Sequence, residues 1–486
     1  MTLRGTLSAE QGTGNWVAYT PDGLFDSSIG GESQVTWLVN REVLTLEQVY
    51  ERFHVFRLTD QLRQDHRPEA PAPPRQVPPR IALEPPTQLV QEKRFTELSV
   101  ALGEAGLENL RLYQNGVAVQ GEADFTATPN PARLVSRVHL RKGLNQFYLM
   151  AGRTGSSEVE GRSGVVEIRY DGPDEPGQIH VLALGVSTYD SGSHSLQFAD
   201  RDAIKLAQFL HRNVRRADES VPGLELVLTN REVSEANVEK AFVTIRDRVR
   251  GRPDDTVVVF LAGHADALND RFYLLLPSFP FPDIAANLPR AQRAAMLAKV
   301  DPQAVLPYVA LYRNISRLGA LQRLVVIDAC QAEAIADDPG VRQIQELIDR
   351  DAHRARTAYL LGARRGEPAG EASALEHGLL TYALLKGLGD RNLEAVPGPP
   401  LLDDEPNADR NHDQIVTTDE LRWYAERTVP RLATRFPLLV QRSGAAGKML
   451  NFRPTANLGQ APRIESASVS FPLVELRRSE SEEKGP

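Results

Sequence analysis

The chain has 486 residues, of which 41% are hydrophobic and 25% are charged, and its net charge at pH 7 is −8. This balance excludes wholesale disorder, and the length favours about two to four domains. No apolar run approaches the ~18–20 residues of a transmembrane helix, and no basic excess points to nucleic acid, so we expect neither a membrane nor a nucleic acid as a partner.

Residues 1–65 form the first expected unit, an N-terminal accessory segment. Its first residues turn polar at once, so we expect no signal peptide. Residues 41–63 have the pattern of a short amphipathic helix. The stretch 66–86 that follows is rich in proline, which predicts an extended linker without secondary structure.

Residues 87–172 are predicted to form a small antiparallel β-sandwich of the immunoglobulin-like kind. Asn115-Gly116 stands between two apolar runs, at 109–113 and 117–119, and this pattern is the strongest short-range signal for a hairpin. Further strands are expected at 134–140, 146–150 and 165–170.

Apolar runs alternate with helical patterns through residues 178–455, which predicts a mostly parallel sheet with helices on both faces. The expected strands are 179–186, 224–228, 256–261, 272–276, 324–327 and 358–361. The expected helices are 199–212, 234–250, a long stretch across 287–320, 341–356, 378–388 and 419–426. Residues 456–486 are expected to form a C-terminal tail, whose last part, 476–486, is expected to be frayed.

Two of these strand ends carry reactive side chains. The strand 256–261 leads into Gly263-His264, and the strand 324–327 leads into the only cysteine, Cys330. Ligands of open α/β sheets bind beyond the carboxyl ends of the strands, and an imidazole makes a nearby thiol a better nucleophile. We therefore expect a catalytic pair. A packed cysteine and an ordinary surface histidine are the plainer interpretation.

The lone cysteine also bears on the compartment. One cysteine cannot form an intramolecular disulfide, so a reducing cytoplasm is the expected location.

The order of the motifs resembles a known family, the bacterial metacaspase-type cysteine peptidases with the caspase-like fold. The resemblance covers about residues 178–450 and rests on Gly263-His264, Asp328-Ala329-Cys330-Gln331, Phe198-Ala199-Asp200-Arg201-Asp202-Ala203 and Glu376-His377-Gly378-Leu379-Leu380-Thr381-Tyr382-Ala383. Residues 15–57 resemble the segment that joins β-propeller repeats to such peptidase domains.

The resemblance implies a cysteine endopeptidase that needs no cofactor. His264 would be the general base, Cys330 the nucleophile, and the backbone N–H groups of Gly263 and Cys330 the oxyanion hole. The carboxylates of Asp202 and Asp328 would line a pocket for a basic side chain, so protein substrates would be cut after Arg or Lys. A charge at a helix N-terminus for Asp202 and a structural hydrogen bond for Asp328 are the plainer interpretations.

The chain departs from the family pattern at three alanines. Ala262 replaces the small hydroxyl residue before Gly-His, Ala265 replaces the glycine after it, and Ala332 replaces a glycine after the cysteine. These changes bear on the width of the pocket and leave the Cys–His pair intact.

The polar stretch 334–356 has two interpretations. It lies where the family has a linker between subunits, so it is either an arginine-rich activation loop cut by an upstream protease or an ordinary loop and helix.

Asp409, Asn411, Asp413 and Glu420 match the spacing of an EF-hand, but Gln414 replaces its glycine. A polar turn that caps the next helix is the simpler account, and we expect no metal.

Two further functions stay open at the level of sequence. The chain is either the expected endopeptidase or an interaction scaffold whose peptidase fold is inactive or regulatory. Hydrolysis of a small acyl substrate is the third hypothesis.

Overall fold

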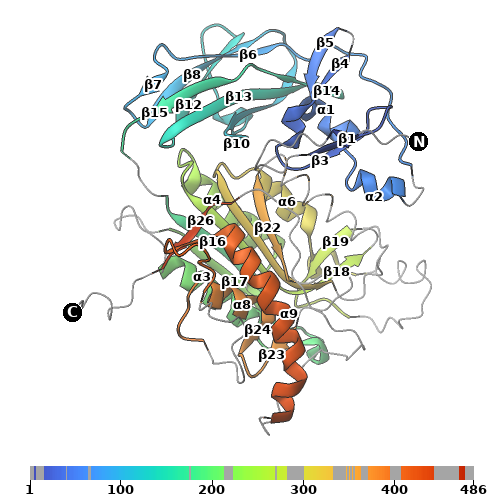
Figure 1. Ribbon diagram of the computed structural model, residues 1–486, viewed down its shortest axis with the longest axis vertical. Helices are drawn as coiled ribbons and strands as arrows, with labels where there is room; N and C mark the ends of the chain where they lie inside the picture. The colour runs from blue at the N-terminus through green and yellow to red at the C-terminus, as the bar shows by residue number, and fades with distance from the viewer. Residues whose placement is uncertain are drawn as a thin grey trace.

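The structure is a computed structural model, and it describes residues 5–6, 16–39, 41–63, 67–173, 177–212, 223–268, 271–281, 300–331, 346, 348, 350, 353, 356–362, 370–393, 407–442 and 470–476. It contains an N-terminal unit (within residues 5–63), a β-sandwich (residues 81–170) and an α/β unit that begins at residue 179 (Figure 1). None of the helices in these ranges combines the length and the apolar character that a membrane crossing needs.

The N-terminal unit is built from short elements. Strands β1 (Gly5–Thr6), β2 (Val17–Tyr19) and β3 (Phe25–Ser27) form one small sheet, and β4 (Thr36–Val39) pairs with β5 (Glu42–Thr45). The prediction of a single helix over 41–63 was wrong. The chain forms β5 and then two helices, α1 (Leu46–Phe53) and α2 (Leu58–Arg63), separated at Arg57, where φ is 54°.

The β-sandwich has the predicted antiparallel architecture except at one edge, where β7 pairs with β15 in parallel. One sheet has the order β10-β9-β13-β15-β7 with β14 paired to β13, and the other has the order β11-β12-β8-β6. The strands are β6 (Ile81–Glu84), β7 (Val90–Gln91), β8 (Phe95–Leu102), β9 (Leu107–Gln114), β10 (Val117–Gln120), β11 (Thr126–Ala127), β12 (Arg133–His139), β13 (Gly143–Arg153), β14 (Ser156–Arg162) and β15 (Val166–Tyr170).

Two expectations for this region have opposite outcomes. The hairpin at Asn115-Gly116 is confirmed, because both residues have positive φ, at 51° and 82°, and join β9 to β10. The linker prediction for 66–86 was wrong at its end, where β6 pairs with β8. Alternating apolar side chains at Ile81 and Leu83 give this short strand a face that packs on the sandwich core.

The centre of the α/β unit is a parallel sheet of five strands, in the order β17-β16-β18-β21-β22. These are β16 (Ile179–Gly185), β17 (Glu225–Thr229), β18 (Thr256–Leu268), β21 (Gln322–Gln331) and β22 (Thr357–Leu361). The two middle strands run longer than the apolar runs that predicted them, so the strand-end motifs lie inside β18 and β21.

The end of β18 carries two further strands, both antiparallel. Strand β19 (Arg271–Leu275) pairs with it, and β20 (Val305–Pro307) pairs with β19. The prediction of a long helical stretch across 287–320 was therefore wrong at 305–307, where the chain forms β20. The helix that the structure describes there is α6 (Tyr308–Ser316).

Helices cover both faces of the parallel sheet, as the alternation predicts. Helices α3 (Ala199–Arg212), α8 (Leu379–Gly387) and α9 (Thr418–Arg442) share one apolar core with the sheet. Helices α4 (Glu235–Val249) and α6 share the other. Because both faces are covered, every residue of β16 is buried, which explains its nearly continuous apolar sequence.

Part of the expected C-terminal tail belongs to the α/β unit. Residues 456–486 were expected to lie outside the α/β unit as a tail, but β26 (Pro472–Glu475) pairs with β25 (Ile415–Thr417). Phe471, Leu473 and Val474 are buried in the same core as α9. These apolar side chains outweigh the entropy lost on ordering the segment.

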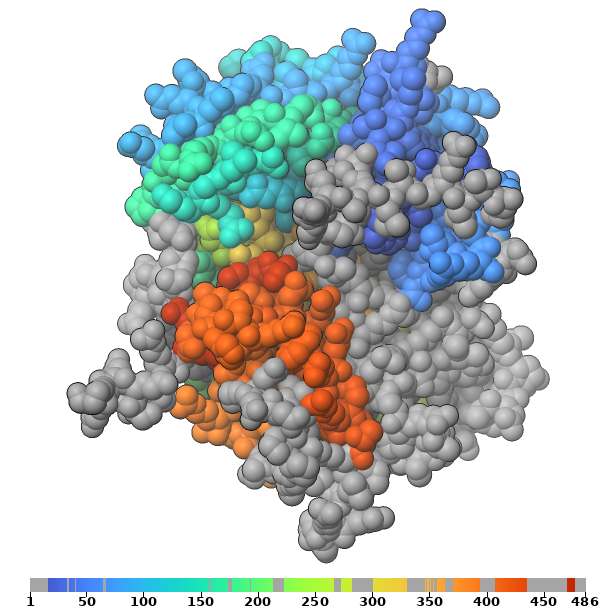
Figure 2. All heavy atoms as spheres, in the orientation of Figure 1, coloured from blue at the N-terminus to red at the C-terminus, as the bar shows by residue number. Residues whose placement is uncertain are grey.

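The N-terminal unit and the sandwich both contact the amino ends of the parallel strands. Asp254, just before β18, accepts hydrogen bonds from Arg94 at 2.5 Å and Arg141 at 2.6 Å, both from the sandwich. Arg356, just before β22, contacts Glu32 of the N-terminal unit at 3.3 Å. These units form one end of the molecule in Figures 1 and 2. Gly263-His264 and Cys330 lie in the carboxyl halves of β18 and β21, away from the strand ends that those units contact.

A buried polar pair fixes the amino ends of β16 and β18. Leu224 N–H donates to His180 Nδ1 at 3.1 Å, so the proton of this imidazole is on Nε2, which donates to Asp255 at 2.8 Å. Burial opposes ionisation of Asp255, but hydrogen bonds from His180, Arg252 and Gln178 outweigh it and lower the pKa of the carboxyl.

Replacing this carboxylate should destabilise the fold strongly. Asp255→Ala should lower the free energy of unfolding by about 3 kcal/mol, because it leaves buried donors without an acceptor. Because the folded-state pKa is depressed, this contribution is present above the unfolded pKa of about 3.9 and is lost as pH falls through the folded pKa. Denaturant unfolding at pH 7 tests it. Asp171→Ala, which removes an exposed ion pair with Arg169, should change stability by less than about 1 kcal/mol.

Candidate active site

The expected catalytic residues are neighbours across the middle of the sheet. Strands β18 and β21 pair in parallel, and their register sets Gly263 opposite Ala329 and His264 opposite Cys330. Partners of this kind lie about 5 Å apart along the hydrogen-bonding direction. For Cys330, the structure describes the course of the backbone. The fold therefore brings together two residues that are 66 positions apart in the sequence.

Hydrogen bonds fix the orientation and the tautomer of His264. Its Nε2 lies 2.8 Å from the backbone carbonyl of His194, and a carbonyl can only accept, so Nε2 carries the proton and Nδ1 keeps its lone pair. The backbone N–H of His264 donates to the hydroxyl of Tyr189 at 3.0 Å. The rings of Tyr189 and Phe281 pack against the imidazole, with centroids 5.1 and 5.5 Å away.

This environment keeps the imidazole neutral. Burial lowers the pKa of His264 below its usual range, although the hydrogen bond to the His194 carbonyl opposes the effect. At neutral pH the ring is therefore a base with a free lone pair on Nδ1.

Glycine is required before the histidine. Gly263 has φ of 149°, a conformation that other residues adopt at a cost. A Cβ at this position would lie 3.3 Å from both the Tyr189 hydroxyl and the Val186 carbonyl. The absence of a side chain thus lets Tyr189 approach close enough to accept the His264 N–H. The oxyanion-hole role of the Gly263 and Cys330 N–H groups stays a prediction.

A buried cluster of carboxylates involves the other two predicted site residues. Asp202 lies in the first turn of α3, and Asp328 lies in β21, two residues before Cys330. They are 2% and 8% exposed. A Cβ added at Gly378 would lie 3.0 Å from one oxygen of each, so these oxygens are at most about 6 Å apart. The structure therefore brings Asp202 and Asp328 together, as the resemblance implies.

The cluster is held by β24 (His377–Gly378) and by α8. His377 Nδ1 lies 2.6 Å from one oxygen of Asp202, and Gly378 N–H donates to the other at 2.9 Å. The Thr381 hydroxyl donates to Asp328 at 3.0 Å. The segment 377–381 thus holds both carboxylates, Asp202 through His377 and Gly378 and Asp328 through Thr381.

Burial and mutual repulsion change the charge of the cluster. Burial raises the pKa of Asp202, whereas its hydrogen bonds with His377 and Gly378 oppose the rise. Burial, followed by the nearby charge of Asp202, raises the pKa of Asp328 to about 7. The cluster therefore gains negative charge as pH rises through neutrality, and a cation nearby would favour that ionised state.

Several residues of the site carry no signal in the sequence. His194 acts through its backbone carbonyl, so its side chain gives no clue. Glu371 of β23 (Glu371–Ala372) accepts the N–H groups of Gln197 and Phe198 just before α3, across 174 and 173 positions. His377 is the exception and could have been predicted, because it stands in the segment 376–383 that supported the family resemblance.

The EF-hand-like residues hydrogen-bond to backbone groups of their own stretch. Asp409 accepts N–H groups from Asp413 and Gln414, as a polar turn requires. Glu420 accepts those of Arg410 and Thr417. Across the ranges that the structure describes, no group of three His, Cys, Asp or Glu side chains is arranged to hold a metal. Most of the stretch 334–356, and Ala332, lie outside those ranges.

Gly263→Ala should strain the backbone beside His264. We expect it to lower the free energy of unfolding by about 1–3 kcal/mol, because φ is unfavourable and Tyr189 must move. Thermal unfolding measures the loss. Gly164→Ala is the matched control, since its added Cβ meets nothing within 4 Å, and it should be close to neutral. Equal stabilities of the two variants would contradict this account.

Comparison with known proteins does not assign the chain to a family. No family model and no curated protein matches the chain. Among solved structures, the endo-β-1,4-mannanase of Thermotoga petrophila is 8% identical over 19% of this chain and 20% of its own, with a TM-score of 0.16. The protein YXIM of Bacillus subtilis is 12% identical over 54% of this chain and 66% of its own, with a TM-score of 0.18. The chain thus spans less than two thirds of either structure, and likenesses this weak carry no argument about its fold or function.

Proposed function

We propose that the chain is a caspase-like cysteine endopeptidase that cuts protein substrates after Arg or Lys. The observation that carries the proposal is the register that sets His264 opposite Cys330 on adjacent parallel strands. The buried carboxylates of Asp202 and Asp328 on the same unit support the choice of a basic residue. A cytoplasmic location and activation by an upstream protease belong to the same proposal and rest on the sequence alone.

The chemistry follows from the state of His264. Nδ1 takes the proton of the Cys330 thiol, and the thiolate attacks the scissile carbonyl carbon. The imidazolium then gives that proton to the leaving amine, which departs and leaves a thioester on Cys330. Water then attacks the thioester carbon while His264 takes one of its protons. The C–S bond breaks, the acid product leaves, and the imidazolium returns the proton to the Cys330 thiolate. Nε2 stays bonded to His194 throughout, so the ring keeps its orientation.

The carboxylate cluster provides the proposed specificity. A guanidinium that approaches Asp202 and Asp328 would form charge-assisted hydrogen bonds and favour the ionised form of Asp328. An aspartate in its place would meet like charge in a desolvated position. The planar fork of arginine suits two carboxylates better than the point charge of lysine, so we expect Arg to be preferred.

The dyad can be tested by single and double substitution. Cys330→Ala and His264→Ala should each lower kcat/KM on Arg peptides by roughly a thousandfold or more, and the double variant should be little worse than either, because the two act as one unit. Thermal unfolding controls for the fold. Substantial turnover by Cys330→Ala would remove the proposal.

The same assay separates the two other functions. An interaction scaffold would show no turnover in the wild type, and a small-acyl hydrolase would cleave esters but not proteins.

The titration of Asp328 predicts a pH dependence of KM. KM for Arg peptides should fall by roughly tenfold from pH 6 to pH 8, because ionisation of the carboxyl, whose pKa is about 7, completes the pocket. Asp328→Asn should raise KM and flatten this profile. A peptide with a neutral residue before the scissile bond is the control, and its KM should not follow pH. A KM for Arg peptides that rises between these pH values would contradict the pocket assignment.

A further inference from the structure

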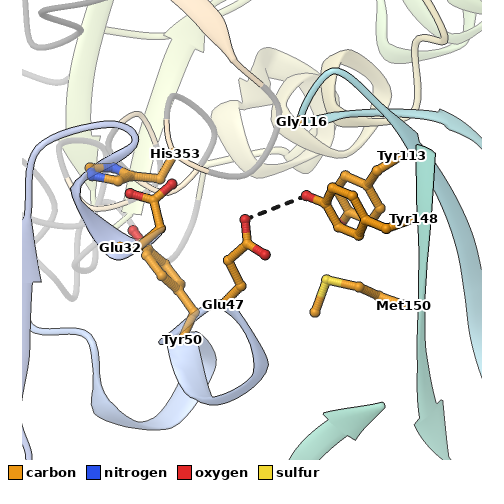
Figure 3. Close-up of a pocket in the computed structure, with 8 residues that line it drawn as sticks. All are labelled: Glu32, Glu47, Tyr50, Tyr113, Gly116, Tyr148, Met150 and His353. Atoms are coloured by element: carbon orange, nitrogen blue, oxygen red, sulfur yellow. Dashed lines mark hydrogen bonds between the residues drawn. The ribbon is translucent and has the colours of Figure 1, made fainter. Parts of the chain in front are cut away.

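One polar network outside the proposed mechanism surrounds a cavity where the three units meet (Figure 3). Both of its carboxylates already pair with arginines, Glu47 with Arg162 at 3.0 Å and Glu32 with Arg356 at 3.3 Å. That network therefore serves to join the units. A second network lies at the carboxyl ends of β16 and β17, and it reaches His264 through a single loop.

The loop 187–196 provides two hydrogen-bond partners of His264. The hydroxyl of Tyr189 accepts its backbone N–H, and the carbonyl of His194 accepts the proton on Nε2. Tyr189 is buried, and its hydroxyl also donates to the Leu275 carbonyl at 3.4 Å. A shift of the loop would move both partners at once, so the orientation of the imidazole depends on how the loop is held.

Asn230 holds the start of this loop. It directly follows the last register pair of β16 and β17, in which Gly185 lies opposite Thr229. Its side-chain carbonyl accepts the backbone N–H groups of Ser187 at 2.9 Å and Thr188 at 2.8 Å. The φ of Asn230 is 48°, and asparagine is among the few residues that adopt this left-handed conformation readily. The residue type therefore suits both the backbone and the two bonds.

Asp200 completes the network from the first turn of α3. Its carboxylate accepts the side-chain amide of Asn230 at 3.0 Å and the hydroxyl of Ser187 at 2.7 Å. Its own N–H donates to the same hydroxyl at 2.9 Å. The Ser187 carbonyl in turn accepts the N–H of Leu196, which closes the loop on itself. Because a carboxylate accepts and an amide NH₂ donates, Asp200 fixes which end of the Asn230 amide faces the loop.

We propose that Asn230 is a positioning residue for His264 and acts through the loop 187–196. By fixing the start of the loop, it holds the His194 carbonyl where that oxygen binds the Nε2 proton. The imidazole then keeps the lone pair on Nδ1 that a general base needs. This role rests on the proposed function, in which His264 is that base.

The proposed arginine pocket has separate anchors. Its two carboxylates, Asp202 and Asp328, are held by the segment 377–381 and not by Asn230. Loss of the Asn230 side chain should therefore act on kcat, through His264, and leave KM for Arg peptides nearly unchanged.

Asn230→Gly tests the role with little change to the backbone, because glycine adopts a φ of 48° freely. Its kcat on Arg peptides should fall by roughly ten- to a hundredfold, the scale expected for a catalytic group that is slightly misplaced. Asn115→Gly is the matched control. Asn115 has a φ of 51° and accepts the Gln146 N–H at 2.9 Å within the sandwich, so its replacement should leave kcat as in the wild type.

NMR of the chain labelled with ¹⁵N-histidine gives a readout that needs no substrate. The His264 signals, identified by their loss in His264→Ala, should show a proton on Nε2 in the wild type. In Asn230→Gly the two tautomers should mix, because the His194 carbonyl is no longer held at Nε2.

An exchange of the two side chains separates a specific pair from a general loss of stability. Asn230→Asp alone sets two carboxylates at the 3.0 Å contact and should lower kcat by at least roughly tenfold. Adding Asp200→Asn returns a donor to that contact and should restore most of kcat, so this pair decides the matter if Asn230→Gly does not fold.

Two results would overturn the proposal. One is a folded Asn230→Gly with the kcat and the His264 tautomer of the wild type. The other is a double variant no more active than Asn230→Asp. A wild type that cleaves no Arg peptide would instead overturn the proposed function, and the histidine spectra would still decide whether Asn230 orients His264.

Discussion

The pairing of β18 with β21 is the constraint on which the rest of the site depends. Ten register pairs join the two strands, from Thr256 opposite Gln322 to Ala265 opposite Gln331. Apolar side chains alternate between the two buried cores along both strands, so a slip of one residue would exchange every side chain between cores of different shape. Packing of the whole sheet therefore holds His264 opposite Cys330.

The same sheet explains which parts of the fold could be predicted. Alternating apolar runs and helical patterns identified the parallel strands and α3, because burial on both faces leaves a strong local signal. The strand ends were predicted too short, since Gly263-His264 and Asp328 interrupt the apolar runs although the backbone continues as strand. β20 and β26 were missed because each is short and forms only on a distant partner.

The site was predictable to the extent that it lies on those strands. His264, Cys330, Asp202 and Asp328 stand at positions that sequence patterns single out, and the fold brings them together in two pairs. Three other residues of the site were not predicted: Tyr189 accepts a backbone N–H, His194 acts through its backbone carbonyl, and Glu371 caps a helix that is distant in the sequence. Contacts of this kind depend on tertiary structure and leave no spacing to recognise.

The pairing of β26 with β25 has a consequence for anyone who shortens the chain. A protein ending near residue 455 would lack Pro472–Glu475, and Ile415–Thr417 would become an unpaired edge strand. The apolar surface now covered by Phe471, Leu473 and Val474 would face water beside that edge. Exposed edges next to apolar surface promote aggregation, so insolubility of such a truncated protein would reflect the missing strand and not an unstable parallel sheet.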